Sequence, residues 1–110
     1  MITRRVLLGA AAGVALHALS PFGALAAEPL KVVASFSILG DMVAEIGKDH
    51  VAVTTLVGPD GDAHVYEPKP ADATGLAAAD VLVVNGLDFE TWLPRLVAAS
   101  GFDGVEVVAT

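Results

Sequence analysis

Short apolar runs recur along the chain and predict its strands. They occupy residues 30–36, 51–57, 81–84 and 105–109, and each is rich in valine or other aliphatic residues. The first run is largely apolar without strict alternation of apolar and polar positions. That pattern is typical of a strand that is buried on both faces of a parallel sheet. The third run is wholly apolar, which predicts a central place in the sheet.

Segments with a helical period separate these runs. Ser37 can cap a first helix and Gly47 can end it. Pro70 can open a second helix, in which Asp72 would favour the positive end of the helix dipole. Apolar residues of the first helix fall together on one helical face. They are Ile38, Leu39, Met42, Val43 and Ile46.

A third helix is predicted over residues 89–99, with Asp88 as its cap. Pro94 lies deeper than the first turn, so we expect either a kink there or a later start of the helix. The apolar residues of this segment recur at helical spacing and predict a buried stripe. They are Phe89, Trp92, Leu93, Leu96 and Val97.

Strands and helices thus alternate three times with short connections, which predicts the α/β fold class. We expect an open parallel sheet of about four strands with helices on both faces. Right-handed crossovers bring the carboxyl ends of the strands to one edge, and open α/β sheets bind their ligands there. The loop of residues 58–72 follows the second strand and is therefore predicted to lie at the binding edge.

The first 26 residues read as an export signal. Arg4 and Arg5 precede an apolar stretch over residues 6–19, and small residues at 24–26 suit a cleavage site. The stretch is shorter than the roughly 20 residues that a membrane span needs. We therefore predict a signal peptide of twin-arginine type over residues 1–26. An ordinary secretory signal and an uncleaved anchor are the alternatives.

Composition narrows the class of the remaining domain, residues 27–110. The chain has no cysteine, so it offers no disulfide, no thiolate metal site and no lipid attachment at a cysteine. We expect a periplasmic protein without a membrane anchor. Its net charge of −7 becomes more negative when the two arginines leave with the signal. So acidic a chain is not expected to bind nucleic acid through its phosphates.

The candidate chemistry centres on His64 in the loop of residues 58–72. Neutral imidazole is the commonest metal ligand in proteins, and glycines and prolines on both sides can hold this one still. Nearby carboxylates could face water or orient the imidazole from behind. The turn formers are Gly58, Pro59, Gly61, Pro68 and Pro70, and the carboxylates are Asp60, Asp62 and Glu67.

The wording of this loop, GPDGDAHVYEPKPAD, resembles the first metal-ligand loop of the periplasmic zinc- and manganese-binding receptors of ABC importers. These receptors form the cluster A-I solute-binding family. Residues 33–39 and 79–87 resemble the same family, whereas Ala63 stands where the family often has proline. The resemblance implies that His64 is one of about four ligands of Zn²⁺ or Mn²⁺.

The resemblance also implies an architecture and a role. Residues 27–110 would be the Rossmann-like amino-terminal lobe of a metal receptor that is not an enzyme. The receptor would capture its metal and pass it to the membrane permease of an ABC importer. The family is more than twice as long as this chain, so we expect truncation before the second lobe. The remaining ligands are then expected beyond Thr110.

Two other functions stay open from the sequence. The chain could be a truncated, non-functional gene product, which the coding sequence beyond Thr110 would reveal. It could also be a small exported α/β enzyme with Ser35, Ser37 and His64 as its reactive groups. The sequence lacks the Gly-x-Ser-x-Gly elbow of serine hydrolases, and the enzyme hypothesis would require turnover or a bound organic ligand.

Overall fold

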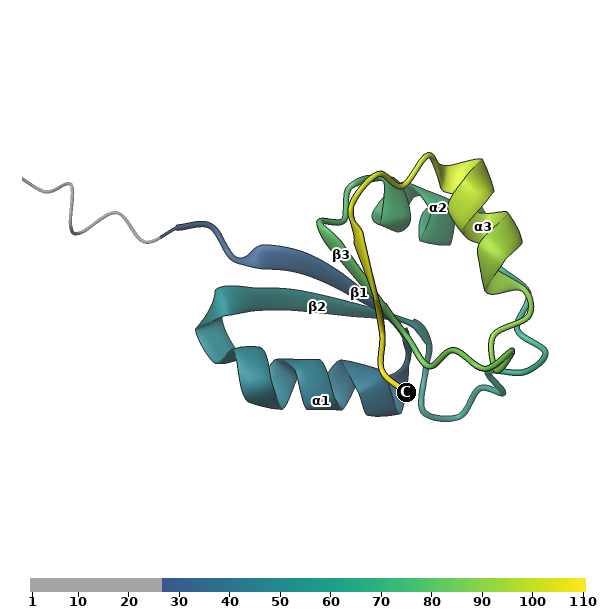
Figure 1. Ribbon diagram of the computed structural model, residues 1–110, viewed down its shortest axis with the longest axis horizontal. Coiled ribbons are helices and arrows are strands. Elements are labelled where there is room, and N and C mark those ends of the chain that lie inside the picture. The colour runs from purple at the N-terminus through teal and green to yellow at the C-terminus, as the bar shows by residue number, and fades with distance from the viewer. Residues whose placement is uncertain (1–26) are drawn as a thin grey trace, which may run out of the picture.

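A computed structural model describes residues 27–110 as one parallel sheet flanked by helices (Figure 1). The strands are β1 (Leu30–Phe36), β2 (Val51–Val57), β3 (Val81–Val84) and β4 (Val105–Val108). Their order in the sheet is β2-β1-β3-β4, and every neighbouring pair is parallel. The predicted signal peptide lies outside the described residues.

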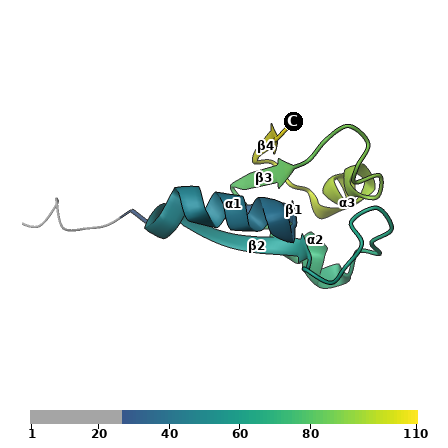
Figure 2. The same ribbon diagram turned by 90° about the horizontal axis from the view of Figure 1, so that it is seen from below.

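Helices cover both faces of the sheet, as predicted. Helix α1 (Ser37–Gly47) lies on one face and is followed by the short 3₁₀ turn η1 (Lys48–His50). Helices α2 (Pro70–Ala77) and α3 (Leu93–Ser100) lie together on the other face (Figures 1 and 2). The α/β class and the alternation of elements are therefore confirmed.

The burial of the strands follows their place in the sheet. β1 lies between β2 and β3, and its residues 32–35 are all buried. β3 is also an interior strand, whereas β4 forms an edge and is exposed along its whole length. The wholly apolar run of β3 thus lies inside the sheet, as predicted, whereas the apolar runs of β2 and β4 form its two edges.

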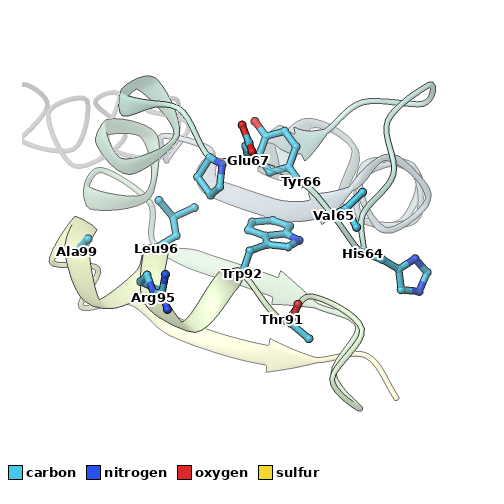
Figure 3. A pocket seen from close by; sticks show the side chains of 10 residues that line it. His64, Val65, Tyr66, Glu67, Thr91, Trp92, Arg95, Leu96 and Ala99 are labelled. Atoms are coloured by element: carbon cyan, nitrogen blue, oxygen red, sulfur yellow. The ribbon is translucent and has the colours of Figure 1, made fainter.

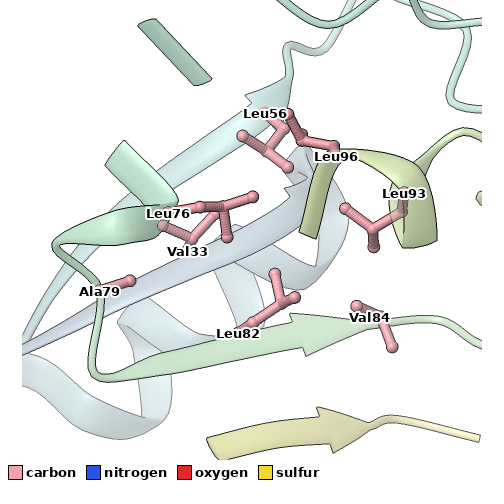
Figure 4. Close-up of a cluster of buried hydrophobic side chains, with 8 residues drawn as sticks. All are labelled: Val33, Leu56, Leu76, Ala79, Leu82, Val84, Leu93 and Leu96. Carbon is pink, nitrogen blue, oxygen red and sulfur yellow. The ribbon is translucent and has the colours of Figure 1, made fainter. Parts of the chain in front are cut away.

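The main hydrophobic core lies between the sheet and the layer of α2 and α3 (Figure 4). Leu76 of α2 and Leu82 of β3 have no exposed surface, so they bring the two layers into direct contact. Tyr66 and Trp92 pack against the edge of this core. The buried members are Val33, Leu56, Leu76, Ala79, Leu82, Val84, Leu93 and Leu96.

Helix α3 begins later than its cap signal suggested. Trp92 is the N-cap residue and Pro94 lies in the first turn, where its missing N–H costs no helical hydrogen bond. The later start allowed by Pro94 is confirmed, and the prediction of Asp88 as cap is wrong. Phe89 consequently lies in a loop ahead of the helix, outside the stripe in which it was placed.

The apolar face of α1 is covered only in part. Leu39 is buried, whereas Ile38, Met42 and Ile46 are 64%, 53% and 82% exposed. Gly40 lies against β2, where a Cβ atom would come 2.2 Å from the Cγ2 atom of Thr55. This close approach seats α1 on its Leu39–Gly40 side, so most of the apolar stripe faces outward.

No helix within residues 27–110 is long and apolar enough to cross a membrane.

Candidate metal centre

His64 lies at the carboxyl edge of the sheet, in the loop that joins β2 to α2. The loop that follows β3 approaches it there, so residues about 25 positions apart in the sequence meet beside the imidazole. This is the edge at which open α/β sheets bind ligands. The fold therefore places the predicted ligand loop at the expected edge.

Two consecutive turns shape the chain before the histidine. The amide of Gly61 donates to the carbonyl oxygen of Gly58 at 3.0 Å, and the amide of Val65 donates to that of Asp62 at 3.3 Å. Gly61 lies so close to the core that a Cβ atom would stand 2.6 Å from the Cγ1 atom of Val57. The first turn thus depends on a glycine at position 61.

Asp62 fixes the orientation of the imidazole. Its Oδ1 atom lies 3.0 Å from Nδ1 of His64 and also accepts the backbone N–H of His64 at 2.9 Å. With Nδ1–H donated to the carboxylate, the Nε2 atom is the acceptor that can bind a cation. The two side chains remain 64% and 61% exposed, so the site is open to solvent.

The same contacts shift the titration of the carboxylate. The pKa of Asp62 is held below its ordinary value of 3.8, first by the backbone N–H of His64 and then by the hydrogen bond from the imidazole ring. Both donors stabilise the charged form of the carboxylate. Asp62 is therefore an anion at neutral pH and can polarise the imidazole from behind.

Phe89 forms a second wall beside the imidazole. The ring centroids of Phe89 and His64 are 4.4 Å apart, with an interplanar angle of 61°. Phe89 also contacts Phe36, at the end of β1, with ring centroids 5.1 Å apart. Nothing in the sequence indicated this contact, because the spacing of Phe89 matches the apolar stripe predicted for the following helix.

Trp92 anchors the loop from the side of α3. Its Nε1–H donates to the carbonyl oxygen of Ala63 at 2.6 Å, and Ala63 itself is buried. The Trp92 ring also meets Tyr66 edge-on, at a centroid distance of 5.0 Å. Figure 3 shows Tyr66 and Trp92 facing each other, while the ring of His64 points away from both.

The end of the loop is joined to α2 through Asp72. The Oδ2 atom of Asp72 accepts the hydroxyl of Tyr66 at 2.6 Å and the backbone N–H of Lys69 at 2.8 Å. Burial, followed by the carboxylate of Asp72, raises the pKa of Tyr66 to about 12. Pro70 opens α2 as predicted, so the exit from the loop is fixed by a hydrogen-bonded helix start.

The other predicted carboxylates do not converge on His64. Glu67 lies beside Tyr66, on the side of the loop away from the imidazole (Figure 3), and Asp60 is exposed at the turn. Within the part of the chain that the structure describes, no three histidine, cysteine, aspartate or glutamate residues are grouped to hold a metal ion. His50 lies in η1, which precedes β2 and so stands at the opposite edge of the sheet.

A buried pair of polar side chains lies behind the loop after β3. Ser35 has no exposed surface and donates its hydroxyl to Oε2 of Glu90 at 2.5 Å. The hydroxyl is therefore out of reach of a substrate, which argues against the nucleophile considered from the sequence. Glu90 could not be predicted from the sequence, because a single glutamate among apolar residues carries no positional signal.

Comparison with known proteins places these features in a family. Residues 32–110 match the family described as zinc-uptake complex component A, periplasmic. The manganese-binding lipoprotein MntA of Halalkalibacterium halodurans is 48% identical over 84 residues, covering 76% of this chain and 28% of the relative. The manganese ABC transporter substrate-binding lipoprotein PsaA of Streptococcus pneumoniae is 36% identical over 97 residues, covering 74% of this chain and 31% of the relative.

A solved structure agrees with the fold. The Mn-bound periplasmic metal binding protein from Candidatus Liberibacter asiaticus is 36% identical and superposes with a TM-score of 0.68. The similarity covers 74% of this chain and 30% of that protein. The chain thus spans about a third or less of the length of the relatives that it matches.

Proposed function

Because the chain belongs to the family of periplasmic zinc-uptake complex component A, we propose that it serves as part of an exported receptor for Zn²⁺ or Mn²⁺. Residues 27–110 form the amino-terminal lobe of this receptor. The receptor hands its metal to the membrane permease of an ATP-driven importer. The relatives named as manganese-binding and as ABC transporter substrate-binding proteins support this role.

The observation that carries the proposal is the arrangement of His64 and Asp62. The carboxylate of Asp62 occupies Nδ1 of the imidazole, and the exposed ring offers Nε2 to a cation at the edge where such sheets bind ligands. His64 is the metal ligand that we assign to this lobe. Phe89 and the anchored loop hold the ring in place before the metal arrives.

This lobe supplies only part of a coordination shell. Zinc takes about four nitrogen, sulfur or oxygen ligands, and manganese favours sites that are richer in oxygen. We infer that further ligands come from another part of the receptor, beyond this lobe. The lobe by itself then binds either metal weakly and with little selectivity, through one imidazole.

Calorimetric titration of the purified protein with Zn²⁺ and with Mn²⁺ tests the proposal. We expect the His64→Ala variant to lose the binding heat that the wild type gives. His50→Ala is the matched control, because His50 is an exposed histidine at the other edge of the sheet. Binding that is unchanged in His64→Ala, or lost equally in both variants, would remove His64 from the metal site.

Export of the chain to the periplasm is a separate part of the proposal. The relatives MntA and PsaA are named lipoproteins, whereas this sequence contains no cysteine. We propose that residues 1–26 direct export through the twin-arginine route and that the exported lobe has no lipid anchor. Replacing Arg4 and Arg5 together by lysine should leave the protein in the cytoplasm on cell fractionation. Unchanged export of that variant would point to the general secretory route.

A further inference from the structure

We propose that Glu90 is a positioning residue of the metal site, which sets the orientation of His64 through its neighbour Phe89. The inference rests on the proposed role of His64 as a metal ligand and adds a residue that makes no contact with the metal. The Glu90 carboxylate is buried and contacts Ser35 and the loop after β3 rather than His64.

Glu90 is only 6% exposed, yet its carboxylate is fully engaged. Oε2 accepts the hydroxyl of Ser35 at 2.5 Å and the backbone N–H of Asn85 at 2.7 Å. Oε1 accepts the backbone N–H of Gly86 at 3.1 Å. A buried carboxylate is costly unless such donors satisfy it, so Glu90 and the backbone around residues 85–86 hold one another in place.

The loop that Glu90 closes has an unusual backbone. Gly86, Leu87 and Asp88 have φ angles of 84°, 55° and 60° in succession. Two of these are not glycine, and such residues rarely adopt positive φ without support from their surroundings. The amide of Phe89 closes the turn by donating to the carbonyl oxygen of Gly86 at 3.1 Å. The side chains of Asn85 and Thr110 donate to the carbonyl oxygens of Gly86 and Asn85. Glu90, which directly follows Phe89, is the side chain that accepts the backbone N–H groups of Asn85 and Gly86.

Phe89 carries this constraint to the metal site. Its ring contacts both Phe36 and His64, at centroid distances of 5.1 Å and 4.4 Å. Asp62 holds the imidazole at Nδ1, and Phe89 limits rotation of the ring from the side. If Glu90 releases the loop, Phe89 moves and the direction of Nε2 is no longer fixed.

The first test needs no metal. In NMR spectra of the metal-free protein, the difference in His64 ring-proton shifts between the wild type and Phe89→Leu measures the contact with Phe89. We expect Glu90→Gln to reproduce most of that difference. The NH₂ group of glutamine is a donor and cannot accept a backbone N–H, so one of the bonds to Asn85 and Gly86 is lost and the loop is released. Asp88→Asn is the matched control: it removes the same charge from an exposed position in the same loop and should leave the shifts unchanged.

A double substitution separates positioning from general support of the fold. In a Phe89→Leu background, Glu90→Gln should add no further change to the His64 shifts if it acts through Phe89. A Glu90→Gln variant with a lower denaturation midpoint but with wild-type His64 shifts would overturn the proposal. If that variant does not fold, Ser35→Ala decides the question, since it removes one donor and keeps the carboxylate; wild-type His64 shifts in folded Ser35→Ala would equally overturn it.

Metal titration completes the test. The Zn²⁺ dissociation constant of Glu90→Gln should rise by about tenfold, the lower end of the effect of losing an orienting partner of a ligand. It should not change in Asp88→Asn. If the wild type binds no metal through His64 while the shifts respond as expected, Glu90 still positions His64, but the proposed receptor function is wrong. If His64 binds metal with equal affinity in the wild type and in Glu90→Gln, the receptor function is supported and the positioning role of Glu90 is wrong.

Discussion

Trp92 and Ala63 are 29 positions apart, and the indole Nε1–H of Trp92 donates to the carbonyl oxygen of Ala63 at 2.6 Å. The bond joins the residue that caps α3 to the residue that precedes His64. Ala63 is buried, so its carbonyl group has little access to water in place of the indole. The position of His64 therefore depends on helix α3, which begins directly after Trp92.

Replacing Trp92 by phenylalanine tests this connection. The variant keeps an aromatic ring against Tyr66 but leaves the Ala63 carbonyl group without its donor. Loss of one partner of a buried hydrogen bond costs about 1–3 kcal/mol, and the smaller ring adds to this. Urea denaturation followed by circular dichroism should show a lower midpoint with an unchanged slope. An unchanged midpoint would mean that the bond contributes nothing to the folded state.

Two glycines of the same turn should respond differently to alanine. In Gly61→Ala the new Cβ atom would stand 2.6 Å from Cγ1 of Val57, a residue that is 1% exposed. The overlap should lower the free energy of unfolding by about 1–3 kcal/mol. At Gly58 nothing lies within 4 Å of an added Cβ atom, so Gly58→Ala should be neutral or raise stability by up to about 1 kcal/mol. Equal denaturation midpoints for the two variants would contradict this assignment of the turn.

Tyr66 gives a prediction at alkaline pH. It is the only tyrosine in the sequence, so near-ultraviolet absorbance reports its ionisation alone. Burial and the hydrogen bond to Asp72 raise its pKa from 10.0 to about 12. Because the folded value is the higher one, the stabilising effect is fully present below pH 10 and is lost as the pH rises through about 12.

The Asp72→Asn variant separates the two causes of this shift. It removes the charge that opposes the tyrosinate but leaves the burial of the ring. The titration midpoint should therefore fall and yet stay above 10.0. A wild-type midpoint close to 10.0 in the folded protein would show that the Tyr66 hydroxyl is free of both effects.

Asp62 gives the corresponding prediction in acid. Its pKa is lowered below 3.8 by the backbone N–H of His64 and then by the imidazole. Its contribution to stability is therefore present above pH 3.8 and is lost as the pH falls through the folded pKa. NMR titration of the Asp62 carboxyl carbon should give a midpoint below 3.8. His64→Ala should raise this midpoint only in part, because the backbone donor remains. A wild-type midpoint at or above 3.8 would contradict the geometry of the loop.

Local chemistry explains which elements the sequence could predict. Pro70 begins α2, and the ranges predicted for the first three strands match the structure residue for residue. Pro94 correctly indicated a late start of α3, although the neighbouring Asp88 was wrongly taken as the cap. These signals are readable because proline, glycine and apolar runs act on the backbone within a few residues of themselves.

Contacts between distant residues explain what the sequence could not predict. Phe89 has the spacing of a core residue of the next helix, and only the folded chain sets it against His64. In the sequence Glu90 is a single charge among apolar residues. In the structure its carboxylate accepts a hydrogen bond from the hydroxyl of Ser35, 55 positions earlier. The apolar residues of α1 share one helical face, which suggested burial. Because α1 contacts β2 closely at Gly40, most of that apolar face is exposed.

The sequence by itself determined the order of the elements and marked His64 as the candidate ligand, since both follow from residue types that act locally. Only the tertiary structure decided what surrounds the imidazole. The sequence shows three carboxylates near His64, those of Asp60, Asp62 and Glu67. It does not show which of them contacts Nδ1, and the structure identifies Asp62. Direction in space depends on packing between strands and helices, which no local pattern encodes.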